Sequence, residues 1–257
     1  MTILYPSPIF GPVHSRRLGL SLGINLMPPD GKICTFDCIY CECGLNDGHR
    51  PTLPRPTQEE VRDALEKKLQ QMAADGQLPD VLTFAGNGEP TAHPAFADII
   101  NDTIELRDRY CPDARVSVLS NATQLHRPEV FGALRLVDNN IQKLDTVNAD
   151  FIRVLDRPVQ PHYDVNNVIE RLKAFNGHVI IQTMFLKSMS GYGLDNTTEQ
   201  YVKPWIEAVR YIQPHQVMVY TIDRETPVSE LLKATPDELD KIAELVRATG
   251  IPCTVSY

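Results

Sequence analysis

The sequence predicts an α/β fold, specifically a partial (β/α)6 TIM-like barrel with parallel strands. Apolar, β-rich runs alternate with helical patterns at a spacing of roughly 35 residues, as βα units do. No low-complexity tract or long linker divides the 257 residues. Polar motifs follow directly after the apolar runs, where β/α barrels place their ligand sites. We therefore expect one domain over residues 1–257, with a core at about 14–225 and a short C-terminal helix and strand at 226–257.

Each expected strand is a short run of apolar and β-branched residues. The six runs cover residues 18–26, 80–86, 115–120, 140–145, 178–186 and 216–222, and a shorter run at 251–255 closes the chain.

The intervening helices carry start signals in the sequence. Thr57 with Glu60, and Thr235 with Glu238, match the capping box that opens helices. Apolar residues at helical spacing predict two further helices, at 165–172 and 201–209. Strands and helices that alternate in this way imply a parallel sheet with right-handed crossovers.

Composition narrows the class of protein. The formal net charge of −8 argues against a protein that holds nucleic acid by bulk electrostatics. No run of about 18 apolar residues is present that could span a membrane, and the first residues lack the pattern of a secretory signal. We therefore expect a cytoplasmic, reducing location, where clustered cysteines bind metal more often than they form disulfides.

Four of the six cysteines lie close together in one short segment. Cys34, Cys38 and Cys41 follow the first strand with the spacing C-x3-C-x2-C, and thiolates so spaced can ligate three irons of a 4Fe-4S cluster while the fourth stays without a protein ligand. Structural zinc sites usually take ligand pairs from separated segments, so a four-cysteine zinc site and a disulfide are weaker alternatives. Cys43 is interpreted as an unpaired loop cysteine, with a role toward a substrate thiol or a second metal as the alternative.

The next two strands also end in polar motifs. Gly86 and Gly88 allow the backbone to approach a ligand closely, and Glu89 can accept a hydrogen bond from an ammonium group. Ser120 and Asn121 end the third strand, where they either bind a nucleoside or cap a helix.

Later strand ends add further candidates. Alternation along the fourth strand places Lys143 and Asp145 on the same side, toward the barrel mouth. Lys143 either forms a Schiff base with a carbonyl substrate or pairs with Asp145. Tyr220, Asp223 and Arg224 end the sixth strand at the same mouth.

Several residues have competing structural explanations. Arg16 and Arg17 either hold a substrate phosphate or carboxylate or form salt bridges that close the barrel. His93 is expected to shape a turn before a helix. Cys111 and Cys253 lie in or beside apolar runs and are expected to be buried thiols, not part of a second cluster.

These motifs resemble the radical S-adenosylmethionine (radical SAM) superfamily over residues 10–225. The features that carry the resemblance are the cysteine spacing with Tyr40 before Cys41 and the segment Gly-Asn-Gly-Glu-Pro at 86–90. The segments "FGPVHSRRLGLSLGINL", "KLD" and "YTIDR" resemble the branch related to wyosine synthetase, a tRNA-modifying enzyme. Only one cluster motif is present, which departs from wyosine synthetase and from peptide-modifying relatives with auxiliary clusters.

The resemblance implies a ligand set. Cys34, Cys38 and Cys41 would hold one 4Fe-4S cluster, and the amino and carboxylate groups of S-adenosylmethionine would chelate the open iron. The turn at 86–89 would receive the methionine ammonium. The backbone at Tyr40, and Thr183, would line the adenine side. The residues expected to bind S-adenosylmethionine are Tyr40, Gly86, Asn87, Gly88, Glu89, Ser120, Asn121, Lys143, Asp145 and Thr183. The candidates for a catalytic role are Lys143, Tyr220 and Asp223.

The implied activity is reductive cleavage of S-adenosylmethionine to methionine and a 5′-deoxyadenosyl radical, which abstracts hydrogen from a substrate. A tRNA nucleoside is the first candidate substrate, and a small metabolite or peptide is the second. An external flavodoxin- or ferredoxin-like electron donor is expected, and no membrane partner. The non-enzymatic alternative is an iron–sulfur electron carrier or a zinc-binding scaffold on a barrel fold.

Overall fold

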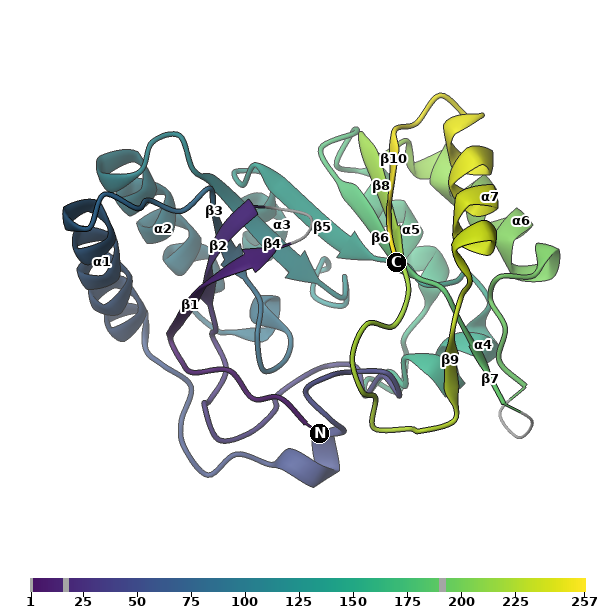
Figure 1. Cartoon of the computed structure of the whole chain (residues 1–257), viewed down its shortest axis with the longest axis horizontal. Helices are drawn as coiled ribbons and strands as arrows, with labels where there is room; N and C mark the ends of the chain where they lie inside the picture. The colour runs from purple at the N-terminus through teal and green to yellow at the C-terminus, as the bar shows by residue number, and fades with distance from the viewer. Residues whose placement is uncertain (1, 16–18, 190–192) are drawn as a thin grey trace.

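The computed structural model describes residues 2–15, 19–189 and 193–257, and its main element is one curved eight-stranded sheet (Figure 1). The strand order is β1-β2-β3-β4-β5-β6-β8-β10, and every neighbouring pair is parallel except β1 and β2. The strands are β1 (Ile9–Ser15), β2 (Gly19–Ile24), β3 (Val81–Phe84), β4 (Arg115–Ser120), β5 (Asn139–Lys143), β6 (Ile180–Met184), β8 (Gln216–Tyr220) and β10 (Cys253–Ser256). The partial barrel with parallel strands is therefore confirmed.

Strand β1 is the one member of this sheet that the sequence pattern did not predict. It lies antiparallel to β2, with Ile9 opposite Ile24 and a bulge between Phe10 and Val13. Gly11 and Pro12 fall in this bulge and interrupt the apolar alternation that normally marks a strand. Arg16 and Arg17 lie outside the described residues, so both explanations of these arginines stay predictions.

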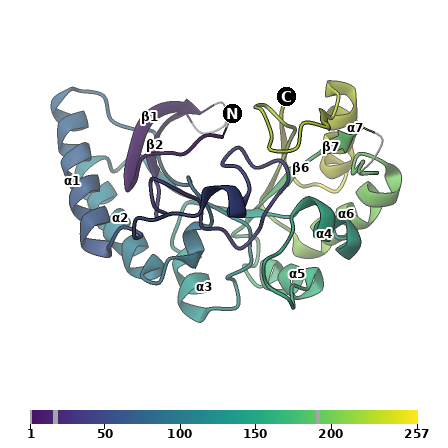
Figure 2. The same cartoon turned by 90° about the horizontal axis from the view of Figure 1, so that it is seen from below.

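Helices cover the outer face of the sheet and follow its curve (Figure 2). Capping boxes open the first and the last of them, as the sequence predicts, because Thr57 and Thr235 each accept from the backbone of a glutamate three residues on. The helices are α1 (Gln58–Ala74), α2 (Phe96–Tyr110), α3 (Pro128–Leu134), α4 (Ala149–Leu155), α5 (Val165–Lys173), α6 (Glu199–Ile212) and α7 (Pro236–Arg247), with 3-10 turns η1 (Asn46–His49) and η2 (Pro90–Ala92).

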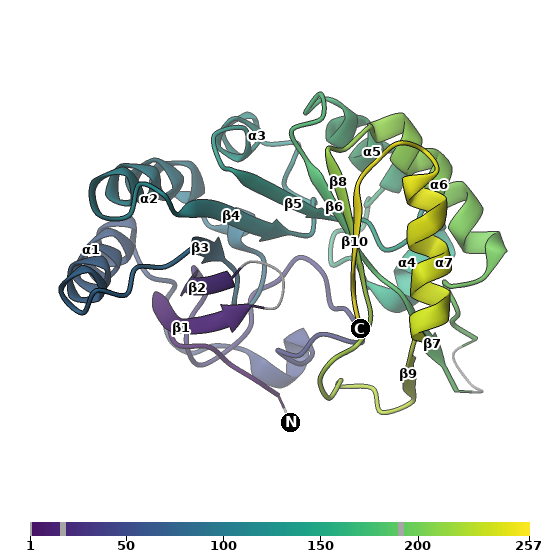
Figure 3. The ribbon, with the colours of Figure 1, turned by 45° about the horizontal axis from the view of Figure 1, so that its top comes forward.

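A small two-stranded antiparallel sheet stands apart from the main sheet. It pairs β7 (Leu186–Ser188) with β9 (Leu231–Lys233), so the segment after β6 meets the segment after β8. From there the chain runs through α7 and back into the main sheet at β10, which lies at the opposite end from β1 (Figure 3).

Side chains alternate between two environments along each strand. The outer face packs against the helices in one continuous apolar core that includes Leu22, Phe84 and Trp205. The inner face holds only a small apolar cluster, in which Ile141, Ile180 and Met218 are buried and Leu119 packs against them. Most of the apolar packing energy therefore lies outside the barrel, and the inside is left for polar groups.

The loops that could carry chemistry lie at the carboxyl ends of the parallel strands. The longest of them connects β2 to α1 and crosses the barrel mouth, as the dark segment in the middle of Figure 2 shows. No helix among the described residues is long and apolar enough to cross a membrane.

Candidate active site at the carboxyl end of the barrel

A cavity of about 510 Å³ occupies the barrel interior and opens at the carboxyl ends of the strands. Its walls come from inward-facing strand positions and from the loop after β2, which is the arrangement expected for a β/α barrel. The lining includes Tyr5, Phe10, Ser21, Tyr40, Cys41, Glu42, Cys43, Thr83, Gly86, Gly88, Leu119, Gln182, Met184, Tyr220, Asp223, Arg224 and Glu225.

The cysteine loop is joined to the glycine turn after β3 by a short parallel bridge. Ile33 N–H donates to Asn87 O at 3.0 Å, and Glu89 N–H donates back to Ile33 O at 3.1 Å. Gly88 makes this contact possible, because its φ is +140° and a Cβ there would lie 1.8 Å from Ile33 O. The two motifs that the sequence singled out are therefore neighbours.

The other side of the cysteine loop is joined to the end of α4. Ile39 N–H donates to Leu155 O at 3.0 Å, and Val159 N–H donates to Thr35 O at 2.9 Å. Backbone hydrogen bonds thus hold the loop from both sides of the barrel, without help from the cysteine side chains.

The three cysteines of the motif surround one buried ammonium group, that of Lys32. Burial opposes the charge of Lys32, but the neighbouring thiols of Cys41, Cys34 and Cys38, together with Asp37, raise its pKa. The Lys32 ammonium also donates to Gly44 O at 2.7 Å. The Lys32 charge acts to lower the pKa of Cys34 and Cys41. Burial outweighs this charge at Cys34 and raises the pKa of its thiol to about 12.

The donor set fits a cluster better than a single metal ion. Within the described part of the chain, no three Cys, His, Asp or Glu side chains are grouped closely enough to hold one ion. A 4Fe-4S cluster needs no such grouping, because each cysteine ligates a different iron. All six cysteines are free thiols, and Cys34 and Cys41 pack against the apolar cluster that contains Cys38. Three thiols on one fixed, partly apolar loop are suitable ligands for such a cluster.

Cys43 lies beside this donor set. The neighbouring Cys43 side chain lowers the pKa of Cys41 to about 6, against the opposing effect of burial. It also lies 3.4 Å from Gly86 O. Cys43 is a free thiol in the loop, in agreement with the expectation, and its hydrogen bond to Gly86 O connects the cysteine loop to the glycine turn.

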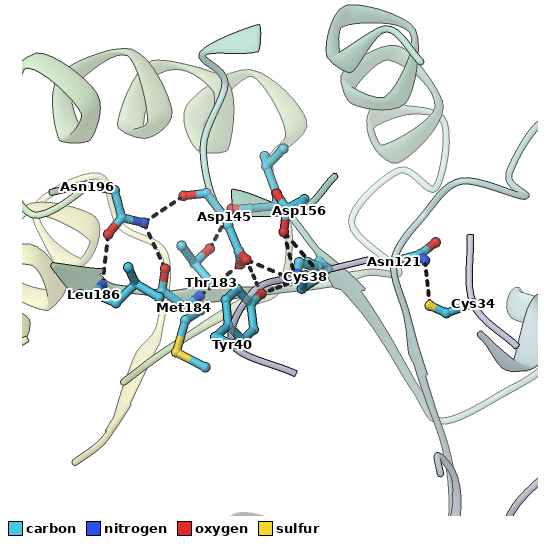
Figure 4. A network of polar contacts seen from close by, with 12 residues as sticks. Cys34, Cys38, Tyr40, Asn121, Asp145, Asp156, Thr183, Met184, Leu186 and Asn196 are labelled. Carbon is cyan, nitrogen blue, oxygen red and sulfur yellow. Dashed lines mark hydrogen bonds and ion pairs between the residues drawn. The ribbon is translucent and has the colours of Figure 1, made fainter. Parts of the chain in front are cut away.

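Lys143 and Asp145 meet in a buried group of polar side chains. Figure 4 shows Asp145, Asp156, Tyr40 and Cys38 gathered in this group. Lys143 Nζ lies 3.0 Å from Asp145 Oδ2 and 3.0 Å from Asp156 Oδ1. The hydroxyl of Tyr40 donates to Asp145, and Lys143 donates to Tyr40. Lys143 Nζ also donates to Cys38 Sγ at 3.3 Å. Strand alternation correctly predicts that Lys143 and Asp145 share one side.

This group keeps Lys143 charged. Burial acts to lower the pKa of Lys143, but Asp145 and Asp156 outweigh it and hold the pKa well above its usual value. A Schiff base requires the neutral amine, so the geometry favours the ion-pair alternative for Lys143.

The Glu89 carboxylate is used inside the protein. It is 2% exposed and accepts from Thr91 N–H and, at 2.7 Å, from Asn121 N–H. The side chain of Glu89 therefore connects the glycine turn to the end of β4.

Asn121 and Ser120 support the loops in a similar way. Asn121 Nδ2 donates to Thr35 Oγ1 at 2.8 Å and lies 3.7 Å from Cys34 Sγ. Ser120 Oγ accepts from Ala122 N–H at 3.1 Å. Neither residue caps a helix, because the next helix, α3, has Arg127 at its N-cap. Ser120 and Asn121 instead support the turn after β4, and Asn121 lies next to an expected cluster ligand.

Two expected ligand residues point away from the cavity. Thr183 is completely buried and its hydroxyl donates to Leu144 O at 2.8 Å, while its neighbours Gln182 and Met184 line the cavity. Asn87 is also completely buried, and its amide donates to Tyr5 O and Pro28 O, both at 2.9 Å. The side chains of Thr183 and Asn87 therefore shape the site without lining it.

The cavity rim joins three distant segments. Arg224 Nη1 donates to Glu42 Oε2 at 2.6 Å and to the Tyr5 hydroxyl at 2.8 Å, and Tyr5 donates to Glu42 Oε1 at 3.0 Å. Tyr220 and Asp223, both predicted from the end of the sixth strand, line the same cavity.

Sequence reasoning missed Lys32, Asp156, Tyr5 and Glu42. Lys32 and Glu42 flank cysteines of the motif, and that position was an available signal. Asp156 and Tyr5 come from segments without a motif.

Comparisons with known proteins agree with this geometry. The family model for the radical SAM superfamily matches residues 29–189. A UPF0026 protein from Synechocystis is 30% identical over 91% of this chain and 82% of its own length. A protein named GTPase Obg from Brachyspira hyodysenteriae is 28% identical over 93% of this chain, which spans 33% of that relative.

Solved structures share the fold at low sequence identity. A radical SAM methyltransferase from Sphaerobacter thermophilus has a TM-score of 0.68 at 16% identity, over 92% of this chain and 66% of that one. TYW1 with a lysine-pyruvate adduct bound has a TM-score of 0.60 at 15% identity, over 89% of this chain and 73% of that one. The fold, the cysteine loop and the family match together show that the chain belongs to the radical SAM superfamily.

Proposed function

We propose that this chain, as one domain over residues 1–257, is an enzyme that cleaves S-adenosylmethionine reductively at a single 4Fe-4S cluster and abstracts hydrogen from a substrate in the barrel cavity. The ligands of the cluster are Cys34, Cys38 and Cys41. The observation that carries the proposal is the bridge between Ile33 and Gly88. It joins the cysteine loop to the turn at 86–89, and Cys41, Gly86 and Gly88 all line the cavity, which supports the proposal.

Cys34, Cys38 and Cys41 would hold the cluster, which would supply the electron for reductive cleavage of S-adenosylmethionine. The residues of the protein bind and orient S-adenosylmethionine and shield it from water. Backbone at 86–89 receives the methionine ammonium, and the group of Lys143, Asp145 and Tyr40 fixes the inner wall. Met184 and Leu119 line the cavity and keep water from the reacting atoms.

The charges of the side chains that line the cavity indicate which class of substrate fits there. The described residues lining the cavity include three carboxylates, on Glu42, Asp223 and Glu225, and one guanidinium, on Arg224. A site that grips RNA phosphates normally carries an excess of cations. The rim therefore favours a small metabolite or a peptide, whereas the resemblance to the wyosine synthetase branch favours a tRNA nucleoside.

Two of the solved neighbours correspond to these two substrate classes. One is the TYW1 structure, and another is Streptococcus suis SuiB bound to the precursor peptide SuiA, with a TM-score of 0.64 at 15% identity over 91% of this chain and 48% of that one. Comparing tRNA nucleosides, metabolites and peptides from cells with and without the protein separates the classes. A change confined to one class identifies the substrate.

The activity is tested with protein reconstituted anaerobically with iron and sulfide. Dithionite and S-adenosylmethionine are added, and 5′-deoxyadenosine is measured. We expect product from the wild type, none from Cys38→Ala, and wild-type product from Cys111→Ala, because Cys111 lies in the outer core. Wild-type protein that holds four reduced irons and forms no 5′-deoxyadenosine would overturn the proposal.

The same experiment separates the enzyme from the non-enzymatic alternative. An iron–sulfur electron carrier would take up and release an electron without cleaving S-adenosylmethionine, and a zinc scaffold would bind zinc in place of iron. In the cell, a flavodoxin- or ferredoxin-like donor would replace dithionite, and a cytoplasmic, reducing location suits the six free thiols.

A further inference from the structure

We propose that Lys143 and Asp156 set the reduction potential of the cluster through the sulfur of Cys38, with Lys143 raising the potential and Asp156 lowering it. This inference rests on the proposed function, because it takes Cys38 as a ligand of a 4Fe-4S cluster. It concerns how readily the cluster accepts an electron, and therefore which electron donors can serve the enzyme.

The first observation is that the Cys38 sulfur lies between a cation and an anion. Lys143 Nζ donates to Cys38 Sγ at 3.3 Å, and Cys38 Sγ lies 3.6 Å from Asp156 Oδ1. Lys143 Nζ is also 3.0 Å from Asp156 Oδ1 and 3.0 Å from Asp145 Oδ2. The two carboxylates therefore hold the ammonium against the sulfur. Without Lys143, a Cys38 thiolate and the Asp156 carboxylate would face each other as two anions.

The second observation is that Cys38 differs in this respect from the other two cysteines of the motif. The Cys34 sulfur lies 3.7 Å from Asn121 Nδ2, which is a neutral and weaker donor. The charge of Lys32 acts on all three thiols, but its ammonium donates to Gly44 O. Among the residues that the structure describes, Lys143 is the cation in hydrogen-bond contact with a sulfur of the motif.

The third observation is that these charges are shielded from water. Cys38 is 8% exposed and Asp156 is 2% exposed, and the side chain of Lys143 is 14% exposed. A charge acts strongly on its neighbour where water screens it little. Reduction adds one negative charge to the cluster and its ligands, so the ammonium stabilises the reduced form and the carboxylate destabilises it. Hydrogen bonds to the sulfurs and nearby charge are established determinants of cluster potentials.

Fold stability does not by itself account for charged groups at this place. A complete buried ion pair is often no more stabilising than apolar side chains of similar volume. Ile141, two residues before Lys143 and on the same face of β5, belongs to the apolar cluster inside the barrel. An apolar side chain at position 143 would extend that cluster. The charged side chains are found instead where β5 meets the cysteine loop.

The inference adds no chemical step to the proposed function. The external donor loses one electron and the cluster gains it. No covalent bond forms or breaks at Lys143 or Asp156, and neither residue has to gain or lose a proton.

The test measures the midpoint potential of the cluster in the wild type, Lys143→Met and Asp156→Asn. Each protein is reconstituted anaerobically, checked for four irons, and titrated with electrons in the absence of S-adenosylmethionine. The pH is 8.5, which lies above the pKa of about 7 of Asp156. Electron paramagnetic resonance of the reduced [4Fe-4S] cluster gives the reduced fraction at each applied potential. Both substitutions remove a charge and keep a side chain of similar size.

We expect the two variants to shift in opposite directions. At a fixed applied potential, Lys143→Met should lower the ratio of reduced to oxidised cluster by about tenfold, and Asp156→Asn should raise this ratio by about tenfold. For a one-electron couple, each change equals a shift of about 59 mV. A purely structural effect, such as water reaching the cluster through a loosened loop, would move both variants in the same direction. Lys187→Met is the control, because Lys187 pairs with Glu238 and does not line the cavity, and it should keep the wild-type potential.

Equal midpoint potentials in the wild type, Lys143→Met and Asp156→Asn, or shifts of both variants in the same direction, would overturn the inference. If Lys143→Met does not hold four irons, Asp156→Asn decides alone: a higher potential supports the inference, and an unchanged or lower one overturns it.

These potentials are measured without any formation of 5′-deoxyadenosine, so the inference and the proposed function can fail separately. If product forms and the potentials of the variants match the wild type, only the inference fails. If the potentials shift as expected and no product appears, the proposed function fails on its own.

Discussion

The ammonium of Lys32 and the carbonyl of Gly44 are joined by a 2.7 Å hydrogen bond. The bond connects the two ends of the segment that contains all four clustered cysteines, so it closes the loop into a ring. Lys32 is 3% exposed, and its charge faces three thiols. One side chain thus fixes the shape of the loop and sets its local electrostatic potential.

Lys32→Met should weaken cluster assembly while leaving the fold intact. The change removes the charge that stabilises the thiolates and leaves a buried carbonyl without its donor, at a cost of about 1–3 kcal/mol. We expect a lower iron content after reconstitution, together with a small loss in thermal stability. Lys67→Met, on the exposed side of α1, is the matched control. Equal iron content in the two variants would show that Lys32 is not needed for assembly.

Gly88→Ala should destabilise the protein strongly. The new Cβ would meet Ile33 O at 1.8 Å, and the residue would be held at a φ of +140°. Strain of this kind costs at least about 1–3 kcal/mol before the clash is counted. Gly132→Ala is the control, because it lies in α3 with nothing within 4 Å of its added Cβ. Urea unfolding of both variants measures the difference in stability between them. An unchanged unfolding midpoint for Gly88→Ala would contradict the close contact between Gly88 and Ile33.

Asp156→Asn should cost about 3 kcal/mol of unfolding free energy above pH 7, because it removes one anion from the buried group around Lys143. Burial raises the pKa of Asp156 to about 7, so the carboxylate is the main form only above that pH. Asp150→Asn provides the comparison. Asp150 also pairs with a cation, Arg153, but the two side chains are 88% and 73% exposed. Exposed pairs contribute little, so Asp150→Asn should unfold almost as the wild type does. Similar decreases in unfolding free energy in both variants would show that burial does not make the ion pairs of Lys143 more stabilising than an exposed pair.

His93 should make the protein less stable in mild acid. Burial lowers the pKa of His93 below the usual 6.5, and its ring is held as the neutral form, with Nδ1 accepting from Ala95 N–H and Nε2 lying 2.9 Å from Pro56 O. Below the ordinary pKa the unfolded chain binds a proton that the folded chain refuses, so the unfolding free energy falls as the pH falls.

The measurement compares urea unfolding at pH 7.5 and pH 5.5. In His93→Gln, the part of the decrease in unfolding free energy between pH 7.5 and pH 5.5 that His93 causes should disappear. His162→Gln, at an exposed position, should show the same decrease as the wild type. An equal loss in wild type and His93→Gln would show that His93 does not carry the effect.

Local signals in the sequence were enough to predict the frame of the molecule. The capping boxes at Thr57 and Thr235 formed as expected because they depend on residues three apart in the chain. His93 shapes the turn before α2, as expected for the same reason. The six parallel strands followed from short apolar runs bounded by turn residues, a pattern that can be read locally in the sequence.

Contacts between segments that are distant in the sequence could not be predicted from these local signals. Asp156 approaches Cys38 and Lys143 only because α4 ends above the cysteine loop. Tyr5 reaches Arg224 across 219 positions of the chain. Thr183 was placed at the cavity because it ends a strand, but strand alternation turns it outward. One position along a strand decides which face a side chain occupies, and strand ends are hard to predict to one residue.

An open barrel has two free edges, and an edge strand invites other chains to add to it. Strand β1 forms one of these edges, and its bulge contains Pro12, which has no N–H to offer an incoming strand. The interruption that hid β1 from sequence analysis thus guards against edge-to-edge aggregation. The protein can leave its barrel incomplete, with room for a bulky cosubstrate, without exposing a continuous template for self-association.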